Sequence, residues 1–135
     1  MHRESNKVLS IIIPVFNEKN FLLKLFDQLK NFFNNNDIEI IFVDDGSTDG
    51  SYNILKNLKD KHEYKFIFKL IKLDINSGKG KAIQTGLKNA VGTYVLLQDA
   101  DLELDIKDAK EMFDMIVNNS DIKCIFGSRY LSGKL

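Results

Sequence analysis

The chain alternates short apolar runs with longer segments in which apolar residues recur at helical spacing. The runs "VLSIIIPVF" and "IEIIFV" are rich in β-branched residues, which is typical of strands buried on both faces of a parallel sheet. The predicted strands cover residues 8–16, 38–43, 64–73, 93–98 and 122–127. Because an amphipathic helical pattern precedes each later strand, the sequence predicts an α/β fold with an open, mostly parallel sheet, alternating helices and right-handed crossovers.

The third run, "YKFIFKLIKL" at residues 64–73, differs from the others because lysine alternates with apolar residues. This pattern indicates a strand near the edge of the sheet with one face in water. An edge of this kind, together with a sheet that would stop at Leu135, also favours self-association, so a homo-oligomer is expected.

Size and charge limit what the chain can do. Its 135 residues suffice for one hydrophobic core, so we expect a single domain over residues 1–135. The 19 basic residues balance the 19 acidic ones, and no overall basic field exists to attract nucleic acid. Any function that depends on charge must therefore be local.

The sequence predicts a soluble, cytoplasmic protein. No apolar run approaches the roughly 20 residues that span a bilayer, and the start "MHRESNK" lacks the apolar segment of a signal peptide. Cys124 is the single cysteine, which excludes an intramolecular disulfide. His2 and His62 lie far from each other and from Cys124, so a metal would need oxygen ligands.

Polar clusters follow the predicted strands, at the carboxyl ends where open α/β sheets bind ligands. The first is "DDGSTDG" after the second strand. One interpretation is a turn followed by a helix that Ser47 or Thr48 caps. The other is that Asp44 or Asp45 accepts a ring N–H of a nucleotide base. The residues alone do not separate the two.

The segment "NSGKGKA" at residues 76–82 has glycines before a predicted helix, as phosphate-binding loops do. It fails both common phosphate-loop patterns, since Ile75 and Ala82 stand where a glycine and a hydroxyl belong, and Ile83 replaces a third glycine. We therefore favour a flexible turn in which Lys79 and Lys81 are solvated over the alternative, a lysine-bearing lid near an anion.

The strongest signal is "QDADLELD" after the fourth strand. Asp105 is explained as the N-cap of a helix that starts near Ile106, and the role of Glu103 stays open. Asp99 and Asp101 are explained less well as solvated loop residues, because two confined like charges repel unless a cation relieves them. Paired carboxylate oxygens suit Mg²⁺ or Mn²⁺, which also bind substrate phosphates.

Taken in order, the motifs resemble those of the inverting family 2 glycosyltransferases of the GT-A fold. The matching segments are "IIIPVFNE" (11–18), "VDDGSTDGS" (43–51), "NSGKGKAIQTGLKNAVGTYVLLQDAD" (76–101) and "GSRYLSG" (127–133). The last is similar to a segment of the polyprenyl-phosphate sugar synthases. The resemblance spans residues 8–133, and the combination of motifs is more specific than any one of them.

The resemblance implies roles for individual residues. Pro14, Phe16, Glu18, Val43 and Asp45 would bind the base and ribose of a nucleotide sugar, and Asp74 would be an additional contact. A second set, formed by Asp99, Ala100 and Asp101, would bind the diphosphate. Within it, Asp99 and Asp101 would be the metal ligands and catalytic residues. Arg129 would contact phosphate or sugar, and Asp44 would support its neighbour.

The implied reaction is transfer of a sugar from a UDP- or GDP-sugar, with inversion and help from Mg²⁺ or Mn²⁺, to an acceptor that the resemblance identifies as a polyprenyl phosphate. Such an acceptor would place the protein at the cytoplasmic face of a membrane as a peripheral protein. Family members continue well past "GSRY", so the chain is expected to be the N-terminal, donor-binding part of a truncated domain. The alternative is a non-catalytic module that binds a nucleotide sugar.

Overall fold

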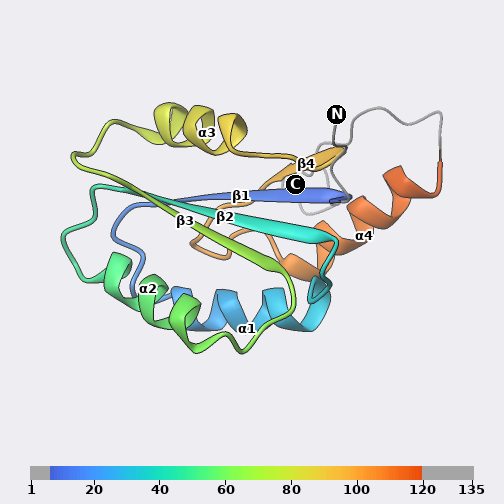
Figure 1. Cartoon of the computed structure of the whole chain (residues 1–135), viewed down its shortest axis with the longest axis horizontal. Coiled ribbons are helices and arrows are strands. Elements are labelled where there is room, and N and C mark those ends of the chain that lie inside the picture. The colour runs from blue at the N-terminus through green and yellow to red at the C-terminus, as the bar shows by residue number, and fades with distance from the viewer. Residues whose placement is uncertain (1–6, 120–135) are drawn as a thin grey trace, which may run out of the picture.

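A four-stranded parallel sheet forms the centre of the structure, a computed structural model that describes residues 7–119 (Figure 1). Its strands are β1 (Leu9–Val15), β2 (Ile38–Asp45), β3 (Ile67–Leu73) and β4 (Tyr94–Leu97). The helices are α1 (Leu22–Phe32), α2 (Ser51–Lys61), α3 (Lys79–Lys88) and α4 (Ile106–Val117). The α/β alternation expected from the sequence is confirmed, whereas the expected strand at 122–127 lies outside the described residues.

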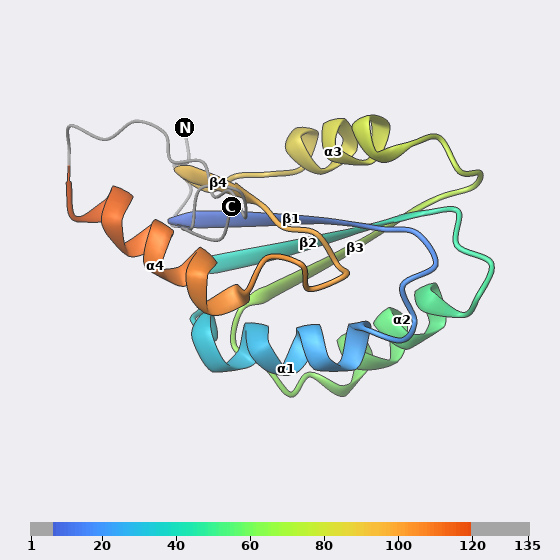
Figure 2. The ribbon, with the colours of Figure 1, turned by 180° about the vertical axis from the view of Figure 1, so that it is seen from behind.

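The strand order is β3-β2-β1-β4, so the chain reverses its direction of travel across the sheet between β3 and β4. The helices follow this reversal: α1 and α2 cover one face, and α3 covers the other (Figure 1, Figure 2). Right-handed crossovers require this change of face. The reversal creates a switch point between β1 and β4, and a crevice outside their carboxyl ends is the usual ligand site of such sheets.

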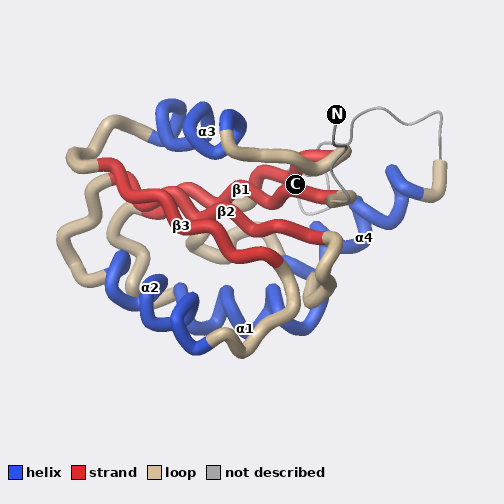
Figure 3. The backbone as a smooth tube through the Cα atoms, in the orientation of Figure 1, coloured by secondary structure: helices blue, strands red, loops and turns tan. Residues whose placement is uncertain are grey.

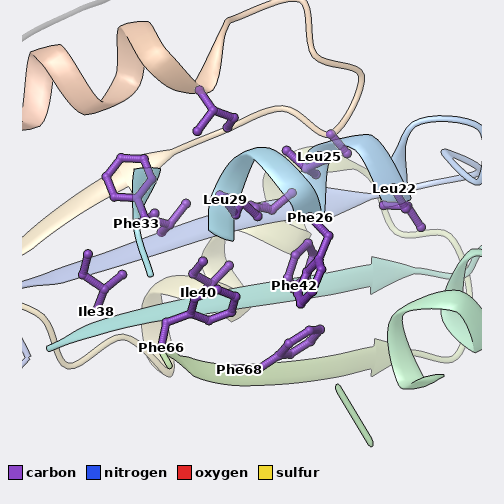
Figure 4. Close-up of a cluster of buried hydrophobic side chains, with 14 of the residues drawn as sticks. Leu22, Leu25, Phe26, Leu29, Phe33, Ile38, Ile40, Phe42, Phe66 and Phe68 are labelled. Carbon is purple, nitrogen blue, oxygen red and sulfur yellow. The ribbon is translucent and has the colours of Figure 1, made fainter. Parts of the chain in front are cut away.

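The larger hydrophobic core lies between the sheet and the helices α1, α2 and α4. Apolar residues of α1 recur at three- and four-residue spacing, and its buried face consists of Leu22, Leu25, Phe26 and Leu29. Figure 4 shows Phe26 above the rings of Phe42 and Phe68, with ring centroids 5.8 Å apart for Phe26 and Phe68 and 4.9 Å apart for Phe42 and Phe68. This aromatic group joins α1 to β2 and β3.

The smaller core lies under α3. It consists of Ile12, Ile41, Val43 and Ala82, all with no exposed surface. A Cβ atom on Gly86 of α3 would come within 2.5 Å of the Ile12 side chain, so the absence of a side chain at this position lets α3 pack closely on β1. Close packing therefore fixes the position of α3 relative to β1.

Three local expectations have different outcomes. The position of β3 at one edge of the sheet is confirmed, and so is Asp105 as the N-cap of α4, because its side chain accepts a hydrogen bond from the Lys107 N–H at 3.0 Å. A cap from Ser47 or Thr48 on the second helix is wrong. That helix begins at Ser51, and Asp49 accepts the Ser51 N–H at 3.0 Å.

Within residues 7–119, the helices are too short and too polar to span a bilayer.

Candidate functional site

A cavity of about 520 Å³ lies at the carboxyl ends of the strands, where the sheet reverses direction. The loops after β1, β2 and β3 gather at this end of the sheet (Figure 3). Seven residues predicted to contact the donor line the cavity: Pro14, Phe16, Glu18, Asp45, Asp99, Ala100 and Asp101. They come from three separate segments, and the fold brings them together.

The other predicted contacts do not line this cavity. Val43 is fully buried in the small core under α3, two residues before Asp45. Asp74 is exposed just after β3. Arg129 lies outside the described residues. The remaining lining residues were not predicted as contacts, and they are Val15, Asn76, Gly78, Lys79 and Glu103.

Glu18 is held at the cavity by hydrogen bonds between the loops that follow β1 and β2. The Ser51 hydroxyl accepts the Glu18 N–H at 3.0 Å and donates to Asp49 at 2.6 Å. One residue earlier, the side-chain oxygen of Asn17 accepts a hydrogen bond from the Thr48 N–H at 2.8 Å. The polar residues of "DDGSTDGS" therefore connect two loops, which explains why they do not cap α2 in the expected way.

Asp45 attaches the loop before α3 to the end of β2. Its carboxylate accepts the backbone N–H groups of Ser77 at 2.7 Å and Gly78 at 2.9 Å. Gly46 permits this approach, because a Cβ there would lie 2.5 Å from the backbone nitrogen of Asn76, and its φ of +74° is a left-handed conformation that suits glycine. The loop at 76–78 is thus fastened to a predicted base-binding residue.

Asp44 and Asp45 have different environments. The Asp44 side chain is fully buried, and one of its oxygens accepts the Ser47 N–H at 3.3 Å. Its other oxygen, Oδ1, has no hydrogen-bond partner among the described residues. Asp45 is the member of the pair that lines the cavity. The structure therefore favours the turn interpretation for Asp44, whereas Asp45 is 3% exposed and both of its carboxylate oxygens already accept N–H groups of the 76–78 loop.

Asp99 and Asp101 flank the buried Ala100 in the loop after β4. The Asp99 carboxylate forms an ion pair with the ammonium of Lys79, the first residue of α3. Lys79 and Lys81 are both exposed as expected, but the ion pair of Lys79 with Asp99 was not predicted. The two members of the ion pair are separated by the whole of α3 and β4, so neither short motif reveals the contact.

The cavity is strongly acidic. Glu18, Asp45, Asp99, Asp101 and Glu103 line it together with a single basic residue, Lys79. Burial raises the pKa of Glu18, and repulsion from Asp101, Asp49 and Asp99 raises it further. Its Oε2 atom is buried without a hydrogen-bond partner among the described residues. Such an excess of negative charge favours binding of a cation.

The donor atoms present fit a hard divalent cation in part. Asp99 and Asp101 offer carboxylate oxygens beside the cavity, and Lys79 already places a positive charge against Asp99. Within residues 7–119, however, no group of three or more acidic, histidine or cysteine side chains is arranged to hold a metal ion. A cation here would therefore need further oxygens from water or from a bound phosphate, as Mg²⁺ commonly does.

The comparisons with known proteins cover most of the chain. A family model described as glycosyl transferase family 2 matches residues 10–133. Among curated proteins, the chain is 32% identical over 133 residues to a dolichyl-phosphate beta-glucosyltransferase of Dictyostelium discoideum, with 92% of this chain and 40% of that protein covered. It is 33% identical over 125 residues to a dolichol-phosphate mannosyltransferase of Pyrococcus furiosus, with 93% of this chain and 34% of that protein covered.

Solved structures show the same fold. S. aureus TarS 1–349 in complex with UDP is similar with a TM-score of 0.64 and 30% identity, covering 80% of this chain and 32% of that one. The mannosyltransferase PcManGT from Pyrobaculum calidifontis, in complex with GDP-Man and Mn²⁺, has a TM-score of 0.64 and 26% identity, covering 69% and 27%. The expected GT-A architecture is confirmed, and the chain spans a third to two fifths of the curated relatives' length.

Proposed function

Because the chain belongs to glycosyl transferase family 2, we propose that its cavity binds the nucleotide-diphosphate part of a UDP- or GDP-sugar and that the sugar passes to a polyprenyl phosphate with inversion. The observation that carries the proposal is the meeting of three predicted donor-binding segments around one cavity at the switch point of the sheet. The cavity volume of about 520 Å³ is in the range of small-molecule sites.

In this proposal the two sides of the cavity have separate tasks. Phe16, which is 44% exposed, and Pro14 offer apolar surface for the base. The Asp45 carboxylate already accepts the N–H groups of Ser77 and Gly78, and one of its further lone pairs would accept a ring N–H. On the other side, Asp99 and Asp101 would hold Mg²⁺ or Mn²⁺ together with the diphosphate. A divalent cation there would neutralise negative charge that develops on the leaving diphosphate.

The proposed transfer breaks the bond between the anomeric carbon and the diphosphate oxygen, and the nucleoside diphosphate leaves with the bonding electrons. An acceptor oxygen attacks the anomeric carbon from the opposite face. A polyprenyl phosphate carries an anionic oxygen already, so no side chain has to remove a proton from it. Support for this acceptor comes from the two curated relatives, whose names are dolichyl-phosphate and dolichol-phosphate sugar transferases.

Calorimetric titration of UDP and GDP, with and without Mn²⁺, tests donor binding. We expect one of them to bind, to bind more tightly with Mn²⁺, and to lose that gain in the double variant Asp99→Asn, Asp101→Asn. The variant Asp108→Asn, at an exposed position of α4, is the matched control and should behave like the native chain. The proposal fails if neither nucleotide binds or if the double variant binds as the native chain does.

Transfer is tested separately with a radiolabelled UDP- or GDP-sugar and a polyprenyl phosphate in detergent. Label in the extracted lipid supports the complete reaction. Binding without labelled lipid would support the alternative, a module that binds a nucleotide sugar without transferring it.

A further inference from the structure

Gln98 is a buried polar residue next to the acidic side of the cavity, but it does not line the cavity. It directly follows β4, is 2% exposed, and its backbone N–H donates to the carbonyl of Ile12 in β1 at 3.0 Å. Its side chain is therefore fixed at the switch point, below the loop that carries Asp99 and Asp101.

The Gln98 side chain connects the two ends of this loop by hydrogen bonds. Its Nε2 atom donates to the carbonyl of Asp99 at 3.2 Å and to the carbonyl of Leu104 at 2.9 Å. The two acceptors are five residues apart, and Leu104 directly precedes Asp105, the N-cap of α4. One carboxamide thus sets the distance between the end of β4 and the start of α4.

The loop between these two points is under strain. Leu102 has a φ of +63°, a left-handed conformation that is unfavourable for a residue with a branched side chain. Asp101 accepts the Glu103 N–H at 3.1 Å, which stabilises the turn locally. Ala100 is 3% exposed and packs in the larger core, so Asp99 and Asp101 are separated by an anchored residue. A strained turn persists only where its surroundings hold it.

We propose that Gln98 is a positioning residue for the cation-binding half of the site: it holds Asp99 and Asp101 at a fixed spacing without touching the ligand. This inference rests on the proposed function. It assigns the spacing of the two carboxylates to the hydrogen bonds from Gln98, and it leaves the base-binding half, with Phe16 and Asp45, independent of Gln98. Groups that orient metal ligands from behind contribute about 10- to 100-fold to metal affinity.

The test compares two affinities in the same full chain. Mn²⁺ binding is followed by the electron paramagnetic resonance signal of free Mn²⁺, and binding of UDP and GDP is measured by calorimetry in excess EDTA. The variant Gln98→Met keeps the side-chain length but cannot donate, and Gln98→Leu removes both polar atoms of the carboxamide without adding a charge. We expect both to weaken Mn²⁺ binding roughly 10-fold, with nucleotide affinity in EDTA unchanged within about twofold.

Gln84→Met is the matched control, because Gln84 is exposed on α3. It should leave both affinities unchanged. If the Gln98 variants bind Mn²⁺ as tightly as the native chain while Asp99→Asn does not, the inference is overturned and the proposed function stands. If the native chain binds neither Mn²⁺ nor a nucleotide, both are overturned. A parallel loss of both affinities in the Gln98 variants would also overturn the inference, because it would indicate general damage.

A measurement on the native chain covers the case in which the variants do not fold. In ¹H–¹⁵N spectra, the side-chain amide protons of Gln98 should exchange slowly with solvent and shift when Mg²⁺ is added, and those of Gln84 should do neither. Fast exchange at Gln98, or signals that do not respond to Mg²⁺, would overturn the inference.

Discussion

Buried carboxylates have different surroundings at the two ends of the sheet. At the amino end, Glu39 of β2 is fully buried, yet its carboxylate meets the ammonium of Lys69 at 2.7 Å and the Val91 N–H at 2.6 Å. Glu39 Oε1 has this ion pair and no hydrogen bond, whereas at the carboxyl end Glu18 and Asp44 each keep a buried oxygen that has neither a hydrogen bond nor an ion pair among the described residues. The buried carboxylate at the amino end is therefore compensated by a cation of the protein, and the two at the carboxyl end are not, as expected if the proposed ligand binds there.

The pKa values express the same contrast. Burial alone would raise the pKa of Glu39, but Lys69, the Ser10 hydroxyl and the Val91 N–H outweigh burial and lower it. Burial and neighbouring carboxylates raise the pKa of Glu18. Ionised Glu39 therefore stabilises the fold, and ionised Glu18 destabilises it. Carboxylates with pKa values perturbed by burial and by neighbouring charges are common where a protein binds a ligand.

The largest effect is expected at the amino end. Glu39→Gln removes the ion pair with Lys69 and disturbs the hydrogen bonds of Ser10 and Val91, so it should lower the free energy of unfolding by about 3 kcal/mol. Because the folded pKa of Glu39 is lowered, this contribution is present above the ordinary glutamate pKa and disappears as the pH falls through the lowered value. Urea unfolding at pH 7 and at acid pH checks both statements.

Nucleotide affinity per folded molecule should not change in Glu39→Gln, since Glu39 lies at the other end of the sheet. A stability change below about 0.5 kcal/mol, the size typical of an unimportant surface substitution, would show that the amino-end network is not a structural one.

A smaller effect is expected from removing the ammonium that now faces Asp99. Lys79→Met should strengthen Mn²⁺ binding in the absence of nucleotide by about threefold, because exposed ion pairs contribute roughly 0.2–1 kcal/mol. The Lys79 side chain is 61% exposed, so its loss should leave the fold intact. Lys81→Met on the same helix is the control. Weaker Mn²⁺ binding in Lys79→Met would mean that Lys79 organises Asp99 and does not compete for it.

The smallest effect concerns stability at the ligand-binding end. Glu18→Gln should raise the melting temperature at pH 7 by a few degrees, because it removes a charge that burial and neighbouring carboxylates disfavour. The folded pKa of Glu18 is raised, so the difference from the native chain should vanish below the ordinary glutamate pKa and grow as the pH rises through the raised value. The exposed Glu63→Gln should show no such trend, and an equal trend there would refute the explanation.

The sequence predicted those features that depend on residues close together in the chain. The four described strands, the edge position of β3 and the Asp105 cap follow from periodicity or from a cap and its neighbours, and all are confirmed. Seven residues that the family resemblance assigned to the donor line the cavity, because they lie at or near strand ends that a parallel sheet brings together. Of the remaining three, Val43 is in the core, Asp74 is exposed just after β3, and Arg129 lies outside the described residues.

Long-range pairings were missed. Lys79 is exposed as expected, but its ion pair was missed because its partner, Asp99, is 20 positions away across a helix and a strand. The Glu39 network escaped notice because its partners lie on two other strands and on the loop before β4, up to 52 positions away. Gln98 belongs to no sequence motif that would indicate its proposed role. That role depends on a hydrogen bond to the Leu104 carbonyl, which forms only in the folded loop.

The central claim is that the carboxyl end of the sheet binds the nucleotide and the amino end does not. It is tested most directly by ¹H–¹⁵N spectra of the full chain during titration with UDP or GDP and Mg²⁺. We predict shifts in the backbone signals of Phe16, Gly78 and Asp101, and no shifts in those of Ser10 and Val91 beside Glu39. Shifts centred on Ser10 and Val91, or no shifts with either nucleotide, would contradict the account.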